Sequence, residues 1–190
     1  NSGSGGEFVL SGGDSSFATG SGGRVVIKTG YGSATTSGSL YVATADAGTA
    51  GVSGYVSMST GVSTSGNTGA FYIGSGTSTA GRGGSIYVTV GSGDSGSGGE
   101  FVLSGGDSSF SSGGRVVIKS GFGSATTSGS LYVATANAGT NGLTGFIAMS
   151  TGVATDGNSG AFFVGSGTAN SGRGGSIYVT VGSGNSGSGG

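Results

Sequence analysis

The sequence of 190 residues contains no proline, cysteine, histidine or tryptophan, and only 7% of its residues are charged. Without cysteine the chain forms no disulfides, and without histidine and cysteine it lacks the commonest acid–base group and the strongest side-chain nucleophile. Intrinsically disordered chains tend to be rich in charge and proline, and this chain is poor in both. These absences favour an ordered chain that is not an enzyme and that uses no metal or cofactor.

The net charge is −1, and no run of basic residues occurs. An electrostatic interaction with nucleic acid or with anionic lipid is therefore not expected. No apolar stretch approaches the ~18 residues of a membrane span, and no signal peptide is visible. The sequence thus predicts no nucleic-acid partner and no membrane span.

Glycine is abundant, with 50 residues, but the apolar residues come in short and regularly spaced groups such as EFVL, RVVIK, SLYVAT and SIYVTV. These groups are rich in valine, isoleucine, tyrosine and phenylalanine, which are typical of β-strands. No segment has the pattern of a helix of ten or more residues. The sequence therefore predicts an all-β protein in which glycine-rich turns separate short strands.

The chain repeats itself on two length scales. The phrase that begins at Asn1 begins again at Asp94 and at Asn185, which divides the chain into superrepeats 1–93 and 94–184 and the start of a third, 185–190. Within each superrepeat, a glycine precedes every apolar group at intervals of about fifteen residues. Gly6, for example, precedes the group that contains Phe8. The whole chain is then filled by twelve units of about fifteen residues.

The positions two and four residues after that glycine are apolar in every unit, and residues two apart on a strand share a face. The predicted core residues of the first superrepeat are Phe8, Leu10, Val25, Ile27, Leu40, Val42, Val56, Met58, Phe71, Ile73, Ile86 and Val88. Nine residues after the glycine every unit has a small residue, such as Ser15 or Ala47. We expect a second, shorter strand there, with small side chains facing the large ones.

The predicted fold is a narrow β-solenoid of about twelve fifteen-residue coils. Coils in such a stack lie about 4.8 Å apart, which predicts a rod of roughly 55–60 Å. Each coil contacts only its neighbours. Neither end of the sequence has the pattern of a cap, so we expect the rod to continue, either covalently or by end-to-end stacking.

The position three residues after the glycine is expected to face outward, yet it is mostly apolar or aromatic. This outward column contains Val9, Val26, Tyr41, Tyr72, Tyr87, Val102, Val117, Tyr132, Phe163 and Tyr178. A free monomer rarely exposes so long an apolar stripe. The column could be a lateral interface with other copies of the chain, a platform that stacks on sugar rings, or a surface that merely reflects β-propensity.

No motif in the sequence indicates catalysis or ligation. GSGDSG at 91–96 fits a dinucleotide-binding pattern, but that fingerprint requires a following helix, and a strand is predicted instead. Asp94 is replaced by Asn185 in the next repeat, and Asp46 by Asn137, so neither carboxylate is required at its position. Calcium-binding nine-residue repeats also differ in period and in aspartate content. The predicted catalytic, cofactor and metal residues are therefore none.

Ice binding is an alternative function. Insect antifreeze proteins with fifteen-residue solenoid coils resemble this chain in period and in Thr, Ser, Gly and Ala content. Those families place T-x-T motifs in flat columns, whereas here the motif is rare. Thr44, for instance, is followed by Ala45 and Asp46. Ice binding and polysaccharide binding both remain alternatives to a structural function.

The phrases TANAGT, GLTG and SGRGGSIYVTVGSG resemble those of very long Gly/Ser/Thr-rich repeat proteins of microalgae and related protists. The resemblance covers the whole chain and implies a secreted or cell-surface structural role in a fibre, sheath or hair. We therefore expect an extracellular filament subunit whose partners are other copies of itself, with glycans as further possible partners. Its Ser/Thr-rich turns are candidate sites for O-linked sugars.

Overall fold

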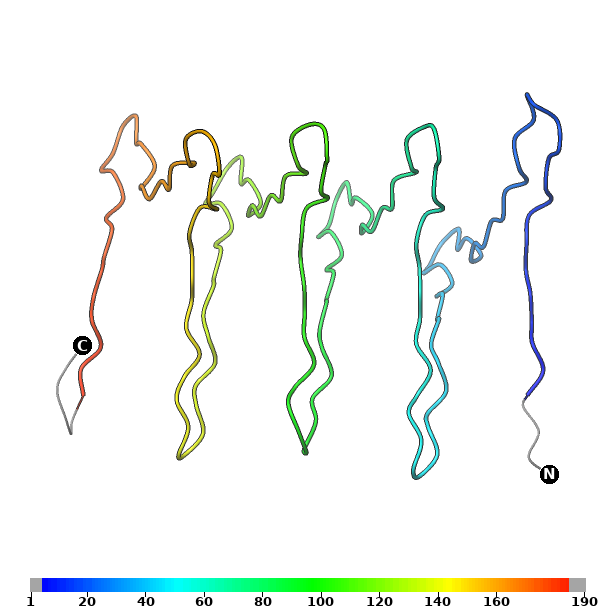
Figure 1. Ribbon diagram of the computed structural model, residues 1–190, viewed down its shortest axis with the longest axis horizontal. Coiled ribbons are helices and arrows are strands. Elements are labelled where there is room, and N and C mark those ends of the chain that lie inside the picture. The colour runs from blue at the N-terminus through cyan, green and yellow to red at the C-terminus, as the bar shows by residue number, and fades with distance from the viewer. Residues whose placement is uncertain (1–4, 185–190) are drawn as a thin grey trace. The chain divides into compact units, whose positions relative to one another are not determined.

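The computed structural model describes residues 5–184, and within this range no residue lies in a helix or a strand. The ribbon in Figure 1 is accordingly drawn as a continuous coil without arrows. The predicted β-solenoid is therefore wrong, because a solenoid requires stacked strands and the described residues contain none. The chain is instead an irregular coil with a regular repeat of bends.

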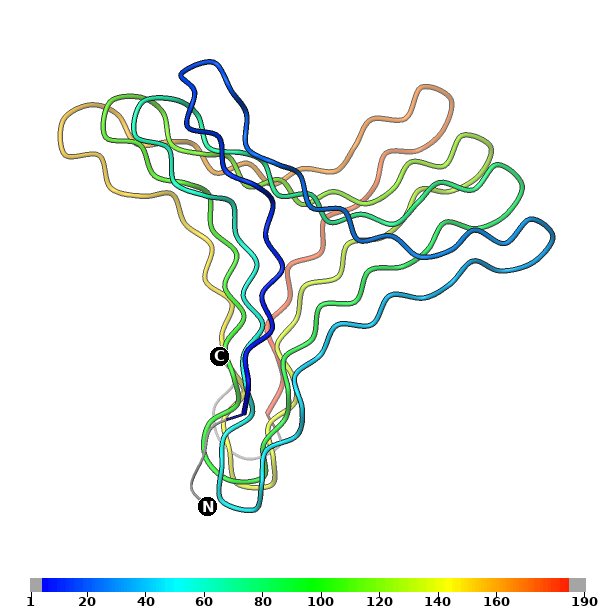
Figure 2. The ribbon, with the colours of Figure 1, turned by 90° about the vertical axis from the view of Figure 1, so that its right-hand side faces the viewer.

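The bends recur with the period found in the sequence. Within the described residues, eleven bends lie at 17–19, 33–35, 49–50, 64–66, 79–81, 94–96, 109–111, 124–126, 140–141, 155–157 and 170–172. The chain folds back on itself at such bends, as the rounded ends of successive loops in Figure 2 show. The fifteen-residue unit is thus real as a unit of local structure, although it does not form a coil of a β-solenoid.

Four loops are closed by backbone hydrogen bonds between glycines. The Gly23 N–H donates to the Gly13 carbonyl with an N···O distance of 2.6 Å, and Gly38 donates to Gly30 at 3.1 Å. The corresponding bonds in the second superrepeat run from Gly114 to Gly106 at 2.7 Å and from Gly129 to Gly121 at 3.0 Å. The two superrepeats therefore form the same loops, even though the first of these loops is two residues shorter in the second superrepeat.

Tighter turns close two equivalent bends. Gly51 donates to the Gly48 carbonyl at 3.1 Å, and Gly142 donates to Gly139 at 3.2 Å. A further turn, from Gly20 to Phe17 at 3.0 Å, lies in the longer first loop. Only two described glycines, Gly96 and Gly157, have a positive φ, of 89° and 120°. Among the described glycines, the left-handed conformation that favours glycine is therefore confined to these two positions.

The core that the solenoid required does not form within residues 5–184, where no hydrophobic side chain is buried. The twelve predicted core residues range in exposure from 45% for Val25 to 88% for Phe8. The less exposed residues are instead at or beside glycine loops, as with Gly12 and its repeat equivalent Gly105. The small residues that we expected on a second strand lie one or two residues before bends, as with Ser63 before 64–66 and Ala47 before 49–50.

The accessible surface area shows how far the chain is from a compact fold. The chain has an accessible surface of 18989 Å². A compact protein of its mass, 17.5 kDa, would expose about 7,900 Å², and the unfolded chain roughly 25,000 Å². Each unit of about fifteen residues contributes only a few large apolar side chains, while its glycines lose the most backbone entropy on ordering. The apolar groups of one chain are too sparse to offset that cost.

The chain divides into two units, Asn1–Val90 and Gly91–Gly190. The sequence placed the boundary between superrepeats after residue 93, close to this division. The predicted start of a third superrepeat, 185–190, lies outside the described residues. Each unit is an irregular series of bends and loops of the kind described above.

The first glycine loop provides a local test of this structure. A Cβ at Gly12 would collide with the Gly23 carbonyl oxygen, whereas a Cβ at the adjacent Gly13 would meet nothing within 4 Å. We expect Gly12→Ala to open the loop and break the hydrogen bond from Gly23, which is worth about 1 kcal/mol. Amide exchange at Gly23, measured by NMR, should then accelerate roughly fivefold. Equal rates in Gly12→Ala and in the control Gly13→Ala would contradict the closed loop.

Candidate functional site

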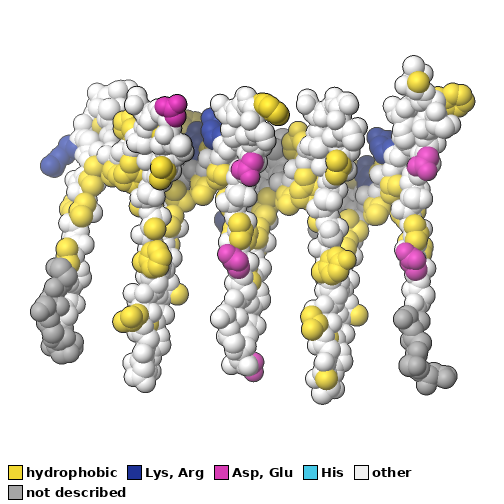
Figure 3. Space-filling view, in the orientation of Figure 1, with side chains coloured by type: hydrophobic (Ala, Val, Ile, Leu, Met, Phe, Trp, Pro, Cys, Tyr) yellow, Lys and Arg dark blue, Asp and Glu magenta, His cyan; other side chains and the backbone are white. Residues whose placement is uncertain are grey.

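The feature that repeats along the surface is the apolar triplet, defined as the residues two, three and four positions after the glycine of each unit. The described triplets are 8–10, 25–27, 40–42, 56–58, 71–73, 86–88, 101–103, 116–118, 131–133, 147–149, 162–164 and 177–179. In Figure 3 apolar side chains appear on the surface in small groups, separated by white backbone and polar residues. The triplets therefore remain available for contact with another molecule.

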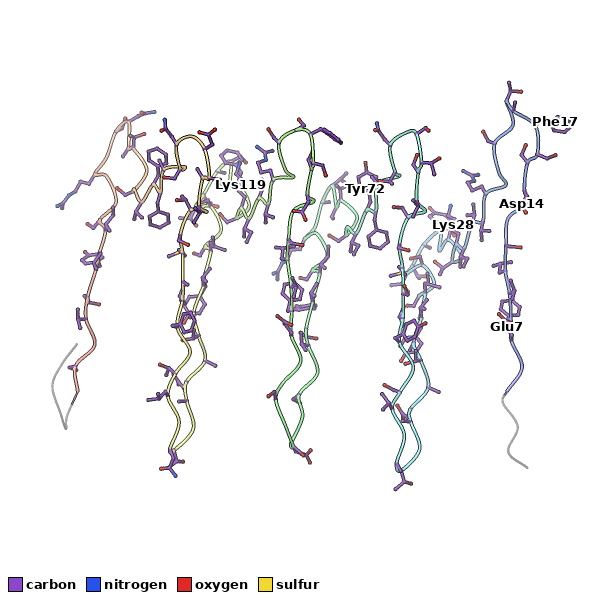
Figure 4. The ribbon with its side chains drawn as sticks, in the orientation of Figure 1. Glu7, Asp14, Phe17, Lys28, Tyr72 and Lys119 are labelled. Atoms are coloured by element: carbon purple, nitrogen blue, oxygen red, sulfur yellow. The ribbon has the colours of Figure 1, made fainter. Side chains whose placement is uncertain are left out.

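Aromatic side chains are the most exposed members of several triplets. In triplet 71–73, Tyr72 is 90% exposed, against 53% for Phe71 and 68% for Ile73. The alternation of the sequence matches the exposures in this triplet but not in triplet 8–10, where Phe8 is 88% exposed and Val9 only 70%. Phe17, at the first bend, also points away from the chain in Figure 4 and is 81% exposed.

The ten residues of the predicted lateral interface are all exposed, from 60% for Val117 to 90% for Tyr72 and Phe163. Each belongs to a different fifteen-residue unit, so the interface would consist of many small contact points along the chain. Whether they bind other copies is not decided by their exposure. The lateral interface remains a prediction.

Wherever one superrepeat has an aromatic residue, the other has an aromatic residue at the equivalent position. The single motifs do not show this regularity. The sixteen rings form eight equivalent pairs: Phe8 and Phe101, Phe17 and Phe110, Tyr31 and Phe122, Tyr41 and Tyr132, Tyr55 and Phe146, Phe71 and Phe162, Tyr72 and Phe163, and Tyr87 and Tyr178. All sixteen are exposed. Aligning the superrepeats residue by residue would have revealed this from the sequence. Because no ring is buried, internal packing does not account for their retention.

The described residues offer no enclosed site for a small molecule. No pocket lies among residues 5–184, and no group of three or more acidic or other ligating side chains there could hold a metal ion. Within the same range there is no helix with the length and apolar character that crossing a bilayer requires. The exposed triplets and aromatic rings are therefore the candidate functional surface.

Two serines at bends have a structural use. The Ser63 hydroxyl accepts a hydrogen bond from the Gly66 N–H at 3.0 Å, and the Ser108 hydroxyl accepts one from the Ser111 N–H at 3.0 Å. Such serine turns satisfy a backbone donor at the bend. Ala154 occupies the position equivalent to Ser63 in the second superrepeat, so this hydroxyl is not needed in every unit.

Comparison of the chain with protein-family models, with curated proteins and with solved structures finds no match in any of the three.

Proposed function

We propose that the chain is a non-enzymatic structural segment of an extracellular or cell-surface filament, and that it associates with copies of itself through its apolar triplets. The observation that carries this proposal is that the large apolar side chains within residues 5–184 are all at least 45% exposed. A monomer rarely leaves so many apolar groups in water without a partner that covers them. The resemblance to repeat proteins of microalgae and related protists supports the extracellular location.

Repetition makes self-association the favoured use of these groups. A single triplet would bind weakly, because it contains only three side chains. Many triplets on one chain act together, since each later contact forms at the high effective concentration set by the linker between units. The net charge of −1 also means that copies repel one another little.

Sedimentation velocity and negative-stain microscopy over a range of protein concentrations test this function. We expect large species at high concentration, visible as elongated filaments. They should dissociate on dilution by mass action, and in urea because urea weakens apolar contacts. A chain that sediments as a monomer at every concentration would contradict the proposal. Discrete globular particles would contradict its filament component.

Polysaccharide binding is a second candidate, supported by the exposure of tyrosine rings. Tyr72 and Tyr87 are 90% and 86% exposed, and aromatic faces of this kind can stack on sugar rings. Under this alternative, Tyr72→Ala together with Tyr87→Ala would abolish retention on immobilised polysaccharide and leave assembly intact. The ice-binding alternative required a flat β-face, and no strand lies within residues 5–184, so it forms no part of the proposal.

A further inference from the structure

The tyrosines are the exposed side chains of the described structure that one-electron oxidation can couple to one another. All seven, Tyr31, Tyr41, Tyr55, Tyr72, Tyr87, Tyr132 and Tyr178, are between 86% and 90% exposed. The sequence contains no tryptophan, cysteine or histidine that would compete with them for an oxidant. The two methionines, Met58 and Met149, are oxidised to sulfoxides, which do not link chains together.

We propose that these tyrosines are sites of oxidative coupling that covalently joins associated copies of the chain. Hydrogen peroxide, acting with a haem peroxidase, removes one electron and one proton from each of two phenols. The two phenoxyl radicals combine through ring carbons adjacent to the hydroxyl groups, and the rings regain aromaticity after the displaced protons move to the oxygens. One carbon–carbon bond forms, two hydrogen atoms leave in total, and the peroxide is reduced to two molecules of water.

The choice between coupling within one chain and coupling between chains depends on concentration. The tyrosines nearest in sequence, Tyr31 and Tyr41, lie ten residues apart, and short linkers give effective concentrations in the millimolar range. A dilute monomer should therefore couple mainly within itself. Assembly raises the local concentration of other copies, so coupling between chains rests on the proposed self-association.

The superrepeats differ in which rings carry a hydroxyl group. Tyr31, Tyr55 and Tyr72 are replaced by Phe122, Phe146 and Phe163, whereas Tyr41 and Tyr87 are retained as Tyr132 and Tyr178. An aromatic ring alone is therefore sufficient at three positions, and the hydroxyl group is kept at the other two. We assign Tyr41, Tyr87, Tyr132 and Tyr178 as the coupling sites that every superrepeat provides. Two reactive sites in each superrepeat allow one chain to be linked to several neighbours.

The experiment begins with chain that has been assembled at high concentration, with the assembly measured by light scattering before any oxidant is added. Hydrogen peroxide and a haem peroxidase are then added, and denaturing gels and dityrosine fluorescence are recorded. We expect covalent multimers that survive denaturation. The same treatment of dilute monomer should give dityrosine fluorescence without multimers. Peptide mass spectrometry should locate cross-links at Tyr41, Tyr87, Tyr132 and Tyr178.

Two variants provide matched controls. Tyr31→Phe, Tyr55→Phe and Tyr72→Phe together make the first superrepeat like the second, and multimers should still form. Replacing all seven tyrosines by phenylalanine should preserve assembly, because every ring remains, and should abolish covalent multimers.

Four outcomes would overturn the inference. If the unmodified chain assembles but forms no covalent multimers, the coupling inference is wrong and the proposed function stands. The same holds if the variant without tyrosine forms covalent multimers. Loss of multimers in the triple variant would overturn the assignment to the four retained tyrosines. Absence of assembly before oxidation would instead overturn the proposed function, and this inference with it.

Discussion

Urea titration of the dilute, unassembled chain is expected to give no sigmoidal unfolding transition. The slope of unfolding free energy with urea is proportional to the surface that unfolding exposes. This chain already exposes 18989 Å², against roughly 25,000 Å² for the unfolded state, so only about a third of the usual area change remains. No buried side chain within residues 5–184 couples one unit to the next. Far-UV circular dichroism should therefore change gradually and without a midpoint.

Amide hydrogen exchange provides the second measurement of this expectation. Protection should be confined to the few donors that form loop and turn hydrogen bonds, such as Gly23 and Gly114. The units between these loops should exchange at nearly the rate of an unstructured peptide. A cooperative urea transition, or slow exchange throughout triplets such as 25–27, would show that the chain folds as a monomer. Either result would contradict the structure described above.

One regularity of the sequence recurs in the structure. The fifteen-residue period appears as bends that recur every fifteen or sixteen residues. The alternation within triplets agrees with the exposures of Tyr41 and Tyr72, 88% and 90%, but fails at Phe8, which is 88% exposed against 70% for Val9. The bends are encoded within a few consecutive glycine-rich residues, and the side that a side chain takes is not.

Burial could not be predicted from the same pattern, because it depends on the total apolar area. Phe8 and Ile27 occupy regular positions, but regular spacing does not show that the buried surface would exceed the entropy cost of ordering the glycines between them. The low content of charge and proline was also a weak argument against a coil. A chain that is poor in charge and proline still needs enough apolar surface to fold. This chain has only a few large apolar residues in each fifteen-residue unit.

The outward column stays a prediction, because the predicted core residues are exposed as well. The outward column was identified by its apolar character, and its ten members are exposed. The paired aromatic positions were missed, because the rings fall at several different positions of the fifteen-residue unit and form no single column. The pair Tyr55 and Phe146, for example, lies outside the outward column and is recognised only when the two superrepeats are aligned.

Replacing the outward column by serine is expected to have the largest effect on assembly. The variant carries serine at Val9, Val26, Tyr41, Tyr72, Tyr87, Val102, Val117, Tyr132, Phe163 and Tyr178. Full burial of one such side chain stabilises by about 1.5–3 kcal/mol, so loss of even two contacts raises the assembly threshold at least about a hundredfold. Light scattering against protein concentration measures that threshold.

The open structure makes this variant easy to interpret. No core within residues 5–184 depends on the ten side chains, so their replacement cannot act by unfolding a globular monomer. The matched control replaces Tyr41, Tyr72 and Tyr87 by phenylalanine, which keeps the rings and should leave the threshold within about threefold of the original, since the loss of an exposed hydroxyl costs little. If the serine variant assembles at the original threshold, the outward column is not the interface. The other triplet positions would then have to supply the contacts between copies.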